Sequence, residues 1–112
     1  MVVEYRTQKL KKQCENPKIA QKDFGPQMRN KLTTRIGEFV AATSLLDIKN
    51  IPAVRLHRLK GDRSDEFAVD LVHPFRLVFI PIGIAEAEYS ELRKITAVRI
   101  ENVEDYHGKQ KR

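Results

Sequence analysis

Apolar residues in the first half of the chain recur at helical spacing. Over residues 26–44 they stand three or four positions apart, with one adjacent pair at the end, so they share one face of a helix. These apolar residues are Met28, Leu32, Ile36, Phe39 and Val40. The polar residues that fall largely on the opposite face are Arg29, Lys31, Arg35 and Glu38. The pattern predicts a long helix that packs its apolar stripe against a sheet.

Shorter elements precede this helix. A strand is expected at residues 2–5, followed by a short basic helix at residues 7–14. Asn16 can cap the next helix, and its first turn tolerates Pro17. A second short helix should therefore extend to about Lys22.

The periodicity changes from helical to strand-like after the long helix. Apolar and polar positions alternate over residues 54–59 and again over residues 67–71, and both runs predict strands. Residues 75–82 are more uniformly apolar, as a central strand would be. The last strand is expected at residues 95–103, after a polar and acidic stretch, residues 83–93, that predicts a loop or a short helix.

This order of elements predicts the fold class. One strand, then helices, then four consecutive strands indicate an α+β fold with the helices on one face of the sheet. We expect a curved, mostly antiparallel sheet of four to five strands. The 112 residues suffice for a single domain, residues 1–112, which ends in a short basic tail at residues 108–112.

Charge narrows the class of partner. The chain has a net charge of +6. Residues 1–63 contain 14 Lys and Arg against 6 Asp and Glu, whereas residues 64–112 contain 7 against 9. A basic first half favours a polyanionic or acidic partner. The single cysteine, Cys14, is expected to be a semi-buried helix residue in a protein from a reducing compartment. No signal-peptide pattern and no run of about 18 apolar residues is present, so we expect a cytoplasmic protein without a membrane partner.

Two clusters of chemically active side chains lie near the ends of separate expected strands. The first contains His57 and Lys60, and the second is the run Asp105-Tyr106-His107. Together they supply the groups that cleave RNA without a metal. A base removes the 2′-hydroxyl proton, an acid protonates the leaving 5′-oxygen, and a cation stabilises the charge on the phosphate. Histidine suits proton transfer because its unperturbed pKa is near neutral.

Roles can be assigned within these clusters. His57 and His107 can form the proton-transfer pair, with acid and base interchangeable. Asp105 can orient an imidazole or act as a base itself, and Tyr106 can stack on a nucleobase or position the 2′-hydroxyl. Lys60 can hold the phosphate. Three scattered histidines and one cysteine give no metal-ligand spacing, so neither a metal nor another cofactor is expected.

Arginines extend the candidate site. Arg76 interrupts an apolar strand, which costs stability unless the side chain is paired or faces a cleft. Its fork of donors suits it to hold the phosphate together with Lys60. The other arginines beside the first cluster are candidate nucleic-acid contacts or a solvated charged face: Arg55, Arg58 and Arg63.

Each residue also has a plainer interpretation. Asp-Tyr-His after a strand is most often a polar terminus, and His57 can be an ordinary surface histidine. Lys60, directly before Gly61, has the position of a common turn lysine. Spacing alone therefore does not establish catalysis.

Three segments resemble a known family. The run Ile-Pro-Ala-Val-Arg-Leu-His-Arg-Leu-Lys-Gly-Asp-Arg at residues 51–63, the strand Phe-Arg-Leu-Val-Phe at residues 75–79 and the ending Val-Glu-Asp-Tyr-His at residues 103–107 are similar to HigB toxins. These belong to the RelE/ParE superfamily of bacterial type II toxin–antitoxin systems. The likeness covers roughly residues 26–107 in order, whereas residues 1–25 match only in kind.

The resemblance implies both an activity and a set of partners. It implies a compact RelE/ParE-like fold and metal-independent cleavage of mRNA in the A site of the 70S ribosome, which inhibits translation. The active-site residues carried over by position are His57, Lys60, Arg76, Asp105, Tyr106 and His107. The implied partner is a HigA-type helix-turn-helix antitoxin, through which the complex contacts operator DNA, in the bacterial cytoplasm.

The resemblance leaves two alternatives. Some members of the superfamily are not nucleases but poison DNA gyrase, and an inactive homologue could retain only antitoxin binding. The complete set of histidine, lysine, arginine and Asp-Tyr-His argues against the gyrase class. The sequence also departs from many relatives at residues 83–94, which are longer and more acidic, and in the basic tail.

Overall fold

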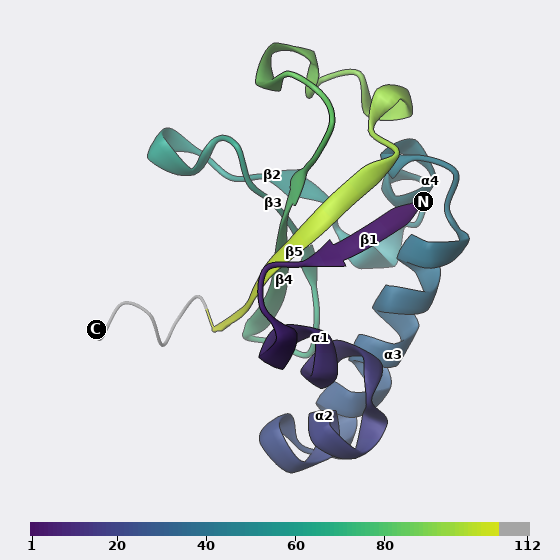
Figure 1. Cartoon of the computed structure of the whole chain (residues 1–112), viewed down its shortest axis with the longest axis vertical. Helices are drawn as coiled ribbons and strands as arrows, with labels where there is room; N and C mark the ends of the chain where they lie inside the picture. The colour runs from purple at the N-terminus through teal and green to yellow at the C-terminus, as the bar shows by residue number, and fades with distance from the viewer. Residues whose placement is uncertain (106–112) are drawn as a thin grey trace.

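The computed structural model describes residues 1–105, and Figure 1 shows their arrangement. Within these residues the α-helices are α1 (Gln8–Glu15), α2 (Pro17–Phe24), α3 (Pro26–Ala41) and α4 (Leu45–Lys49). The strands are β1 (Val2–Tyr5), β2 (His57–Arg58), β3 (Phe67–Asp70), β4 (Phe75–Pro81) and β5 (Ala97–Asp105). Short 3-10 turns are η1 (Pro52–Val54), η2 (Gly61–Arg63), η3 (Glu86–Glu88) and η4 (Leu92–Lys94).

The strands form one mixed sheet in the order β1-β5-β4-β3-β2. β1 runs parallel to β5, and the other neighbours are antiparallel. The helices gather on one side of this sheet (Figure 1). The expected α+β class, with a mostly antiparallel sheet of up to five strands, is confirmed.

Side-chain caps explain where the first two helices begin. Thr7 caps α1, because its Oγ1 accepts a hydrogen bond from the backbone N–H of Leu10 at 3.1 Å. Asn16 caps α2 as predicted, with its Oδ1 accepting from the N–H of Lys18 at 3.0 Å, and Pro17 occupies the first turn. α2 extends to Phe24, two residues beyond the expected end.

The long helix α3 differs from the prediction in three respects. It ends at Ala41, and Ser44 then caps the separate helix α4 by accepting from the N–H of Leu46 at 3.3 Å. Val40 is 60% exposed and does not belong to the buried stripe. Arg35 was expected on the polar face but is only 4% exposed, because its guanidinium donates to the carbonyl of Asp70 at 2.8 Å and to Glu38 at 3.0 Å.

Two of the expected strands have different bounds. Only His57 and Arg58 of residues 54–59 form a strand, because η1 and the left-handed conformation of Arg55 (φ 51°) interrupt the extended chain. The last strand begins at Ala97 and includes Asp105, where residues 95–103 were expected. The extension follows from pairing with β4, which continues to Phe75 opposite Asp105.

The main core lies between the helices and one face of the sheet. Phe79 of β4 is fully buried at its centre, with its ring 5.0 Å edge-on from that of Phe39 of α3 and 5.9 Å from that of Phe67 of β3. The opposite sheet face has only a small buried cluster, Leu59, Ala68 and Val78. Among the described residues, none of the helices has the length and apolarity required to cross a bilayer.

Replacement of Phe79 by alanine should destabilise the protein strongly. The change removes the ring that joins α3 to the sheet, and cavity formation of this kind costs about 3–5 kcal/mol in free energy of unfolding. Urea denaturation followed by circular dichroism measures the loss. The matched control is Val40→Ala, which removes an exposed side chain and should change stability by less than about 0.5 kcal/mol. Equal effects of the two substitutions would contradict this description of the core.

Candidate functional site

Strands β2, β3 and β4 bring two of the predicted residues, His57 and Arg76, to one face of the sheet. His57 on β2 pairs with Ala68 on β3, and Ala68 in turn pairs with Val78 on β4. Arg76 lies two residues before Val78 on β4, so the alternation of side chains puts His57 and Arg76 on the same sheet face. Along the strand direction, Arg76 is offset from the row of His57, Ala68 and Val78 by about 7 Å, because two residues of an extended chain span this length. This face is opposite the main core.

The second cluster is described only in part. Asp105 is the last residue of β5 and lies opposite Phe75. Strand alternation directs Asp105 to the sheet side on which the Phe75 ring lies 6.5 Å from that of Phe24, and not to the side of Arg76. The other two predicted residues of this cluster, Tyr106 and His107, lie outside the described residues.

Lys60 and His57 lie at the outer end of the sheet. Lys60 lies two residues after the end of β2 and is exposed, as expected of a side chain that could reach a phosphate. The Nδ1 atom of His57 is 2.8 Å from the carbonyl oxygen of Arg55. Because a carbonyl only accepts, Nδ1 carries the proton in this contact, and Nε2 is the acceptor nitrogen of the neutral ring. Of the two ring nitrogens of His57, Nε2 is therefore the one not committed to the Arg55 carbonyl.

Sequence analysis missed the residue at the centre of this face, Glu104. Its side chain is 7% exposed and lies directly across from Arg76 in the β4–β5 register. Its Oε2 accepts from Arg76 Nε at 2.8 Å and Nη2 at 2.5 Å, and its Oε1 accepts from Arg63 Nη2 at 2.8 Å. Arg63 also donates to Glu66 at 2.5 Å. We call these four residues, Arg63, Glu66, Arg76 and Glu104, the arginine–glutamate cluster.

The cluster alters the ionisation of its members. Burial alone would raise the pKa of Glu104, but hydrogen bonds from Arg63 and Arg76 outweigh it and hold this pKa below its usual value. The hydrogen bond to Glu104 raises the pKa of Arg63, so the guanidinium stays charged. The stability cost of an arginine in an apolar strand is thus offset by pairing, which was one of the two expected solutions for Arg76. The sequence indicated that Arg76 needs an anionic partner, but it did not indicate that this partner is Glu104.

The candidate nucleic-acid-binding arginines also have carboxylate partners. Arg55 binds Asp70 in a bidentate pair, with both N–O distances at 2.9 Å. Arg58 donates to Glu86 at 3.2 Å, and its guanidinium carbon lies 5.1 Å above the ring of Tyr89. Together with Arg63 in the cluster, all three arginines are engaged within the protein. A phosphate at these positions must compete with a carboxylate.

The acidic segment at residues 83–94 is packed against the sheet. It forms the 3-10 turns η3 and η4. Glu86 accepts from Ser64 at 3.1 Å as well as from Arg58, and the Tyr89 ring lies 5.8 Å from that of Phe67. The segment therefore contributes to the packing around β2 and β3, which its polar sequence did not suggest.

Within residues 1–105, neither Cys14 nor a group of metal-ligating side chains forms a second candidate catalytic site. Cys14 is buried, and its burial together with the nearby Glu15 raises the pKa of the thiol to about 12. It is thus a poor nucleophile, in agreement with the structural role expected for it. Within residues 1–105, no three side chains of His, Cys, Asp or Glu come together as metal ligands.

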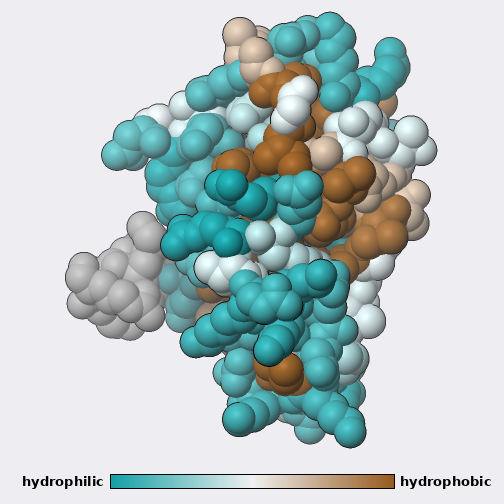
Figure 2. Space-filling model, in the orientation of Figure 1, coloured by the Kyte–Doolittle hydropathy of each residue, from teal (hydrophilic) through white to brown (hydrophobic). Residues whose placement is uncertain are grey.

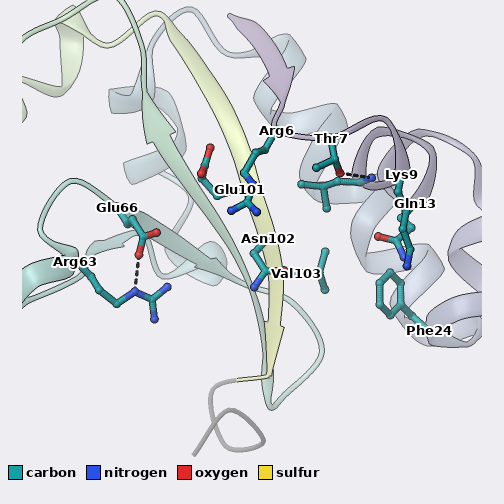
Figure 3. Close-up of a pocket in the computed structure, with 11 residues that line it drawn as sticks. Arg6, Thr7, Lys9, Gln13, Phe24, Arg63, Glu66, Glu101, Asn102 and Val103 are labelled. Atoms are coloured by element: carbon teal, nitrogen blue, oxygen red, sulfur yellow. Dashed lines mark hydrogen bonds and ion pairs between the residues drawn. The ribbon is translucent and has the colours of Figure 1, made fainter. Parts of the chain in front are cut away.

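A groove adjoins the cluster at the edge of β5, and residues from both sides of the sheet line it. It has a volume of about 470 Å³ and lies between the start of α1 and the end of β5 (Figure 3). We call it the α1–β5 groove. β5 runs along its floor, Arg63 and Glu66 stand on one side, and Lys9 and Phe24 come from the helices on the other (Figure 3). Among residues 1–105, Arg63 is the only residue predicted to act on RNA that lines this groove.

Comparison with protein-family models found no matching family, and comparison with curated proteins found no match.

Replacement of Glu104 by glutamine should destabilise the protein by about 2 kcal/mol at pH 7, because it weakens hydrogen bonds to two charged groups. The pKa of Glu104 is lowered by folding, so its contribution is complete above the ordinary glutamate pKa of 4.5. That contribution is lost as the pH falls through the lowered folded-state pKa. Urea denaturation of both proteins between pH 7 and pH 3 should therefore show a stability difference that shrinks in acid.

Glu86→Gln is the matched control, because Glu86 is half-exposed and paired with a half-exposed Arg58. It should cost at most about 1 kcal/mol. A pH-independent difference between wild type and Glu104→Gln would refute the assigned ionisation of Glu104.

Proposed function

We propose that this protein is a HigB-type toxin of the RelE/ParE superfamily, a ribosome-dependent and metal-independent mRNA endonuclease. One observation supports this above all others. Residues 57–60 and Arg76 are far apart in sequence, yet β3 alone separates their strands, and Arg63 shares Glu104 with Arg76 near the end of β5. Arg63, Arg76 and Glu104, one residue from each of the three segments that resemble HigB toxins, are thus joined by hydrogen bonds.

The proposed reaction is transfer of the phosphoryl group to the neighbouring 2′-oxygen. A base takes the proton of the 2′-hydroxyl, the 2′-oxygen bonds to phosphorus, and the bond from phosphorus to the 5′-oxygen breaks. An acid protonates the departing 5′-oxygen, which leaves a 2′,3′-cyclic phosphate. We assign the first transfer to His107, assisted by Asp105, and the second to His57, although the reverse assignment balances equally well. Tyr106 stacks on a base or positions the 2′-hydroxyl.

Cations complete the proposed site. Lys60 is exposed three residues after His57 and offers a flexible ammonium to the phosphate. Arg76 is held by Glu104, so its guanidinium is already oriented before RNA arrives. Preorganised charge of this kind stabilises a transition state better than a side chain that must first be ordered. The ribosome supplies placement of the mRNA, which a small open surface lacks.

The proposal includes the partners that the family resemblance implies. A HigA-type helix-turn-helix antitoxin would block the toxin and would carry the complex to operator DNA. The basic charge of the first half of the chain fits both an acidic protein partner and ribosomal RNA.

Primer extension on a defined mRNA tests the proposed activity. Wild-type protein should cut the mRNA only when programmed ribosomes are present. His107→Ala and Lys60→Ala should each lower the cleavage rate by about 10²- to 10⁴-fold, because each removes a proton-transfer or phosphate-binding group. Circular dichroism and binding to the antitoxin should stay unchanged.

Lys49→Ala is the matched control for charge, since Lys49 is an exposed lysine on α4. It should cleave at the wild-type rate. A folded protein that arrests growth without cutting mRNA, and whose alanine variants remain toxic, would contradict the nuclease and favour a non-nuclease growth inhibitor.

A further inference from the structure

The basic side chains around the candidate site differ in whether a carboxylate of the protein pairs with them. On the sheet, Arg55, Arg58, Arg63 and Arg76 are each within 3.2 Å of a carboxylate oxygen. By contrast, Arg6 and Lys9 at the start of α1 form no ion pair with any carboxylate of residues 1–105. The helical edge of the sheet therefore carries uncompensated positive charge, as does the exposed Lys60 of the candidate site, which likewise forms no ion pair with a carboxylate of residues 1–105.

Both of these cations line the α1–β5 groove (Figure 3). The groove also contains two acids, but each is neutralised. Glu66 accepts from Arg63 at 2.5 Å, and Glu101 accepts from Arg99 at 2.6 Å. The N-terminal end of α1, whose first turn has no acidic residue, adds partial positive charge. The net charge that a ligand meets in the groove is thus positive.

The rest of the lining is amphipathic. Phe24 is half-buried and offers an aromatic surface, with Leu10 and Val103 beside it. Asn102 is exposed on β5 and carries an amide that can both donate and accept. A volume of about 470 Å³ falls within the range of about 300–1,000 Å³ that is usual for small-ligand sites. One or two nucleotides fit these dimensions.

We propose that the α1–β5 groove binds single-stranded RNA next to the cleaved phosphate, with Arg6 and Lys9 on the backbone phosphates. The groove meets the proposed cleavage site through Arg63, which lines the groove and shares Glu104 with Arg76. Asn102 contacts a base edge, and the aromatic surface of Phe24 supports a base. This assignment rests on the proposed function. It adds a binding surface to which, within the described part of the chain, Arg63 alone of the predicted RNA contacts belongs.

Hydrophilic side chains dominate the molecular surface over α1 and α2 (Figure 2). Further exposed lysines lie there, including Lys18 and Lys22 on α2, but neither lines the groove. These lysines provide a control that changes net charge equally while leaving the groove intact.

The test is equilibrium binding of a 12-nucleotide RNA with 2′-O-methyl riboses, which cannot be cleaved. Binding is measured by fluorescence anisotropy between about 25 and 300 mM KCl, a range that brackets about 0.1 M salt. Each phosphate contact to a single strand contributes about 0.7 to the slope of log affinity against log salt. The double variant Arg6→Gln and Lys9→Gln should therefore lower the slope by about 1.4 and weaken binding about 25-fold at 0.1 M salt. Lys18→Gln with Lys22→Gln should retain the wild-type slope.

Two outcomes would overturn the proposal. One is a wild-type protein that does not bind the RNA even at the lowest salt concentration. The other is a groove variant whose affinity and slope equal those of the α2 control. Ribosome-dependent cleavage of mRNA by wild type and His107→Ala is measured separately with the same preparations. If the groove variant binds RNA as the control does but the wild type still cleaves mRNA, only the groove proposal is wrong. If the wild type does not cleave mRNA, the proposed nuclease activity is wrong.

Discussion

β4 and β5 pair from Phe75 opposite Asp105 to Pro81 opposite Val98, and this antiparallel register determines both faces of the sheet. On the helix side it aligns apolar residues such as Leu77 and Val103. On the other side it aligns Arg76 with Glu104. A slip by one residue would exchange the two faces, since side chains alternate along a strand. The main core and the arginine–glutamate cluster therefore depend on the same set of backbone hydrogen bonds.

The cluster shows how a charged group is accommodated in a largely apolar strand. Glu104 is nearly buried, and a buried carboxylate without partners would be strongly destabilising. Two guanidiniums neutralise it from neighbouring structural elements. The same hydrogen bonds restrict the rotamers of Arg63 and Arg76. Such restriction is what a phosphate-binding surface requires, because the cations need no further ordering when the anion arrives.

Electrostatics also divides the molecule into two regions with different expected behaviour toward RNA. Sheet arginines are paired with acids, so they lose one partner when they gain a phosphate. Arg6 and Lys9 are not paired with acids of residues 1–105, so a phosphate there releases counterions without breaking an ion pair. Under the proposed function, the helical edge would supply affinity for RNA, and the sheet would supply oriented groups for chemistry.

The sequence by itself determined the features that depend on neighbouring residues. Asn16 and Pro17 specified the start of α2, and alternation at residues 67–70 specified β3, because caps and strand periodicity act over a few positions. Likewise, the order of helices and strands was sufficient for the α+β class. The stretch containing His57 was assigned correctly to a strand end, although most of its expected strand is irregular.

Only the tertiary structure decided the features that join distant segments. Arg76 and Glu104 are 28 residues apart, and no local pattern encodes the register that pairs them. Arg35 became buried because the carbonyl of Asp70, 35 residues away, accepts its hydrogen bond. The groove exists only where α1 comes to lie beside β5. Such contacts depend on how whole elements pack, and the free energy of packing is a property of the folded molecule that residue spacing does not record.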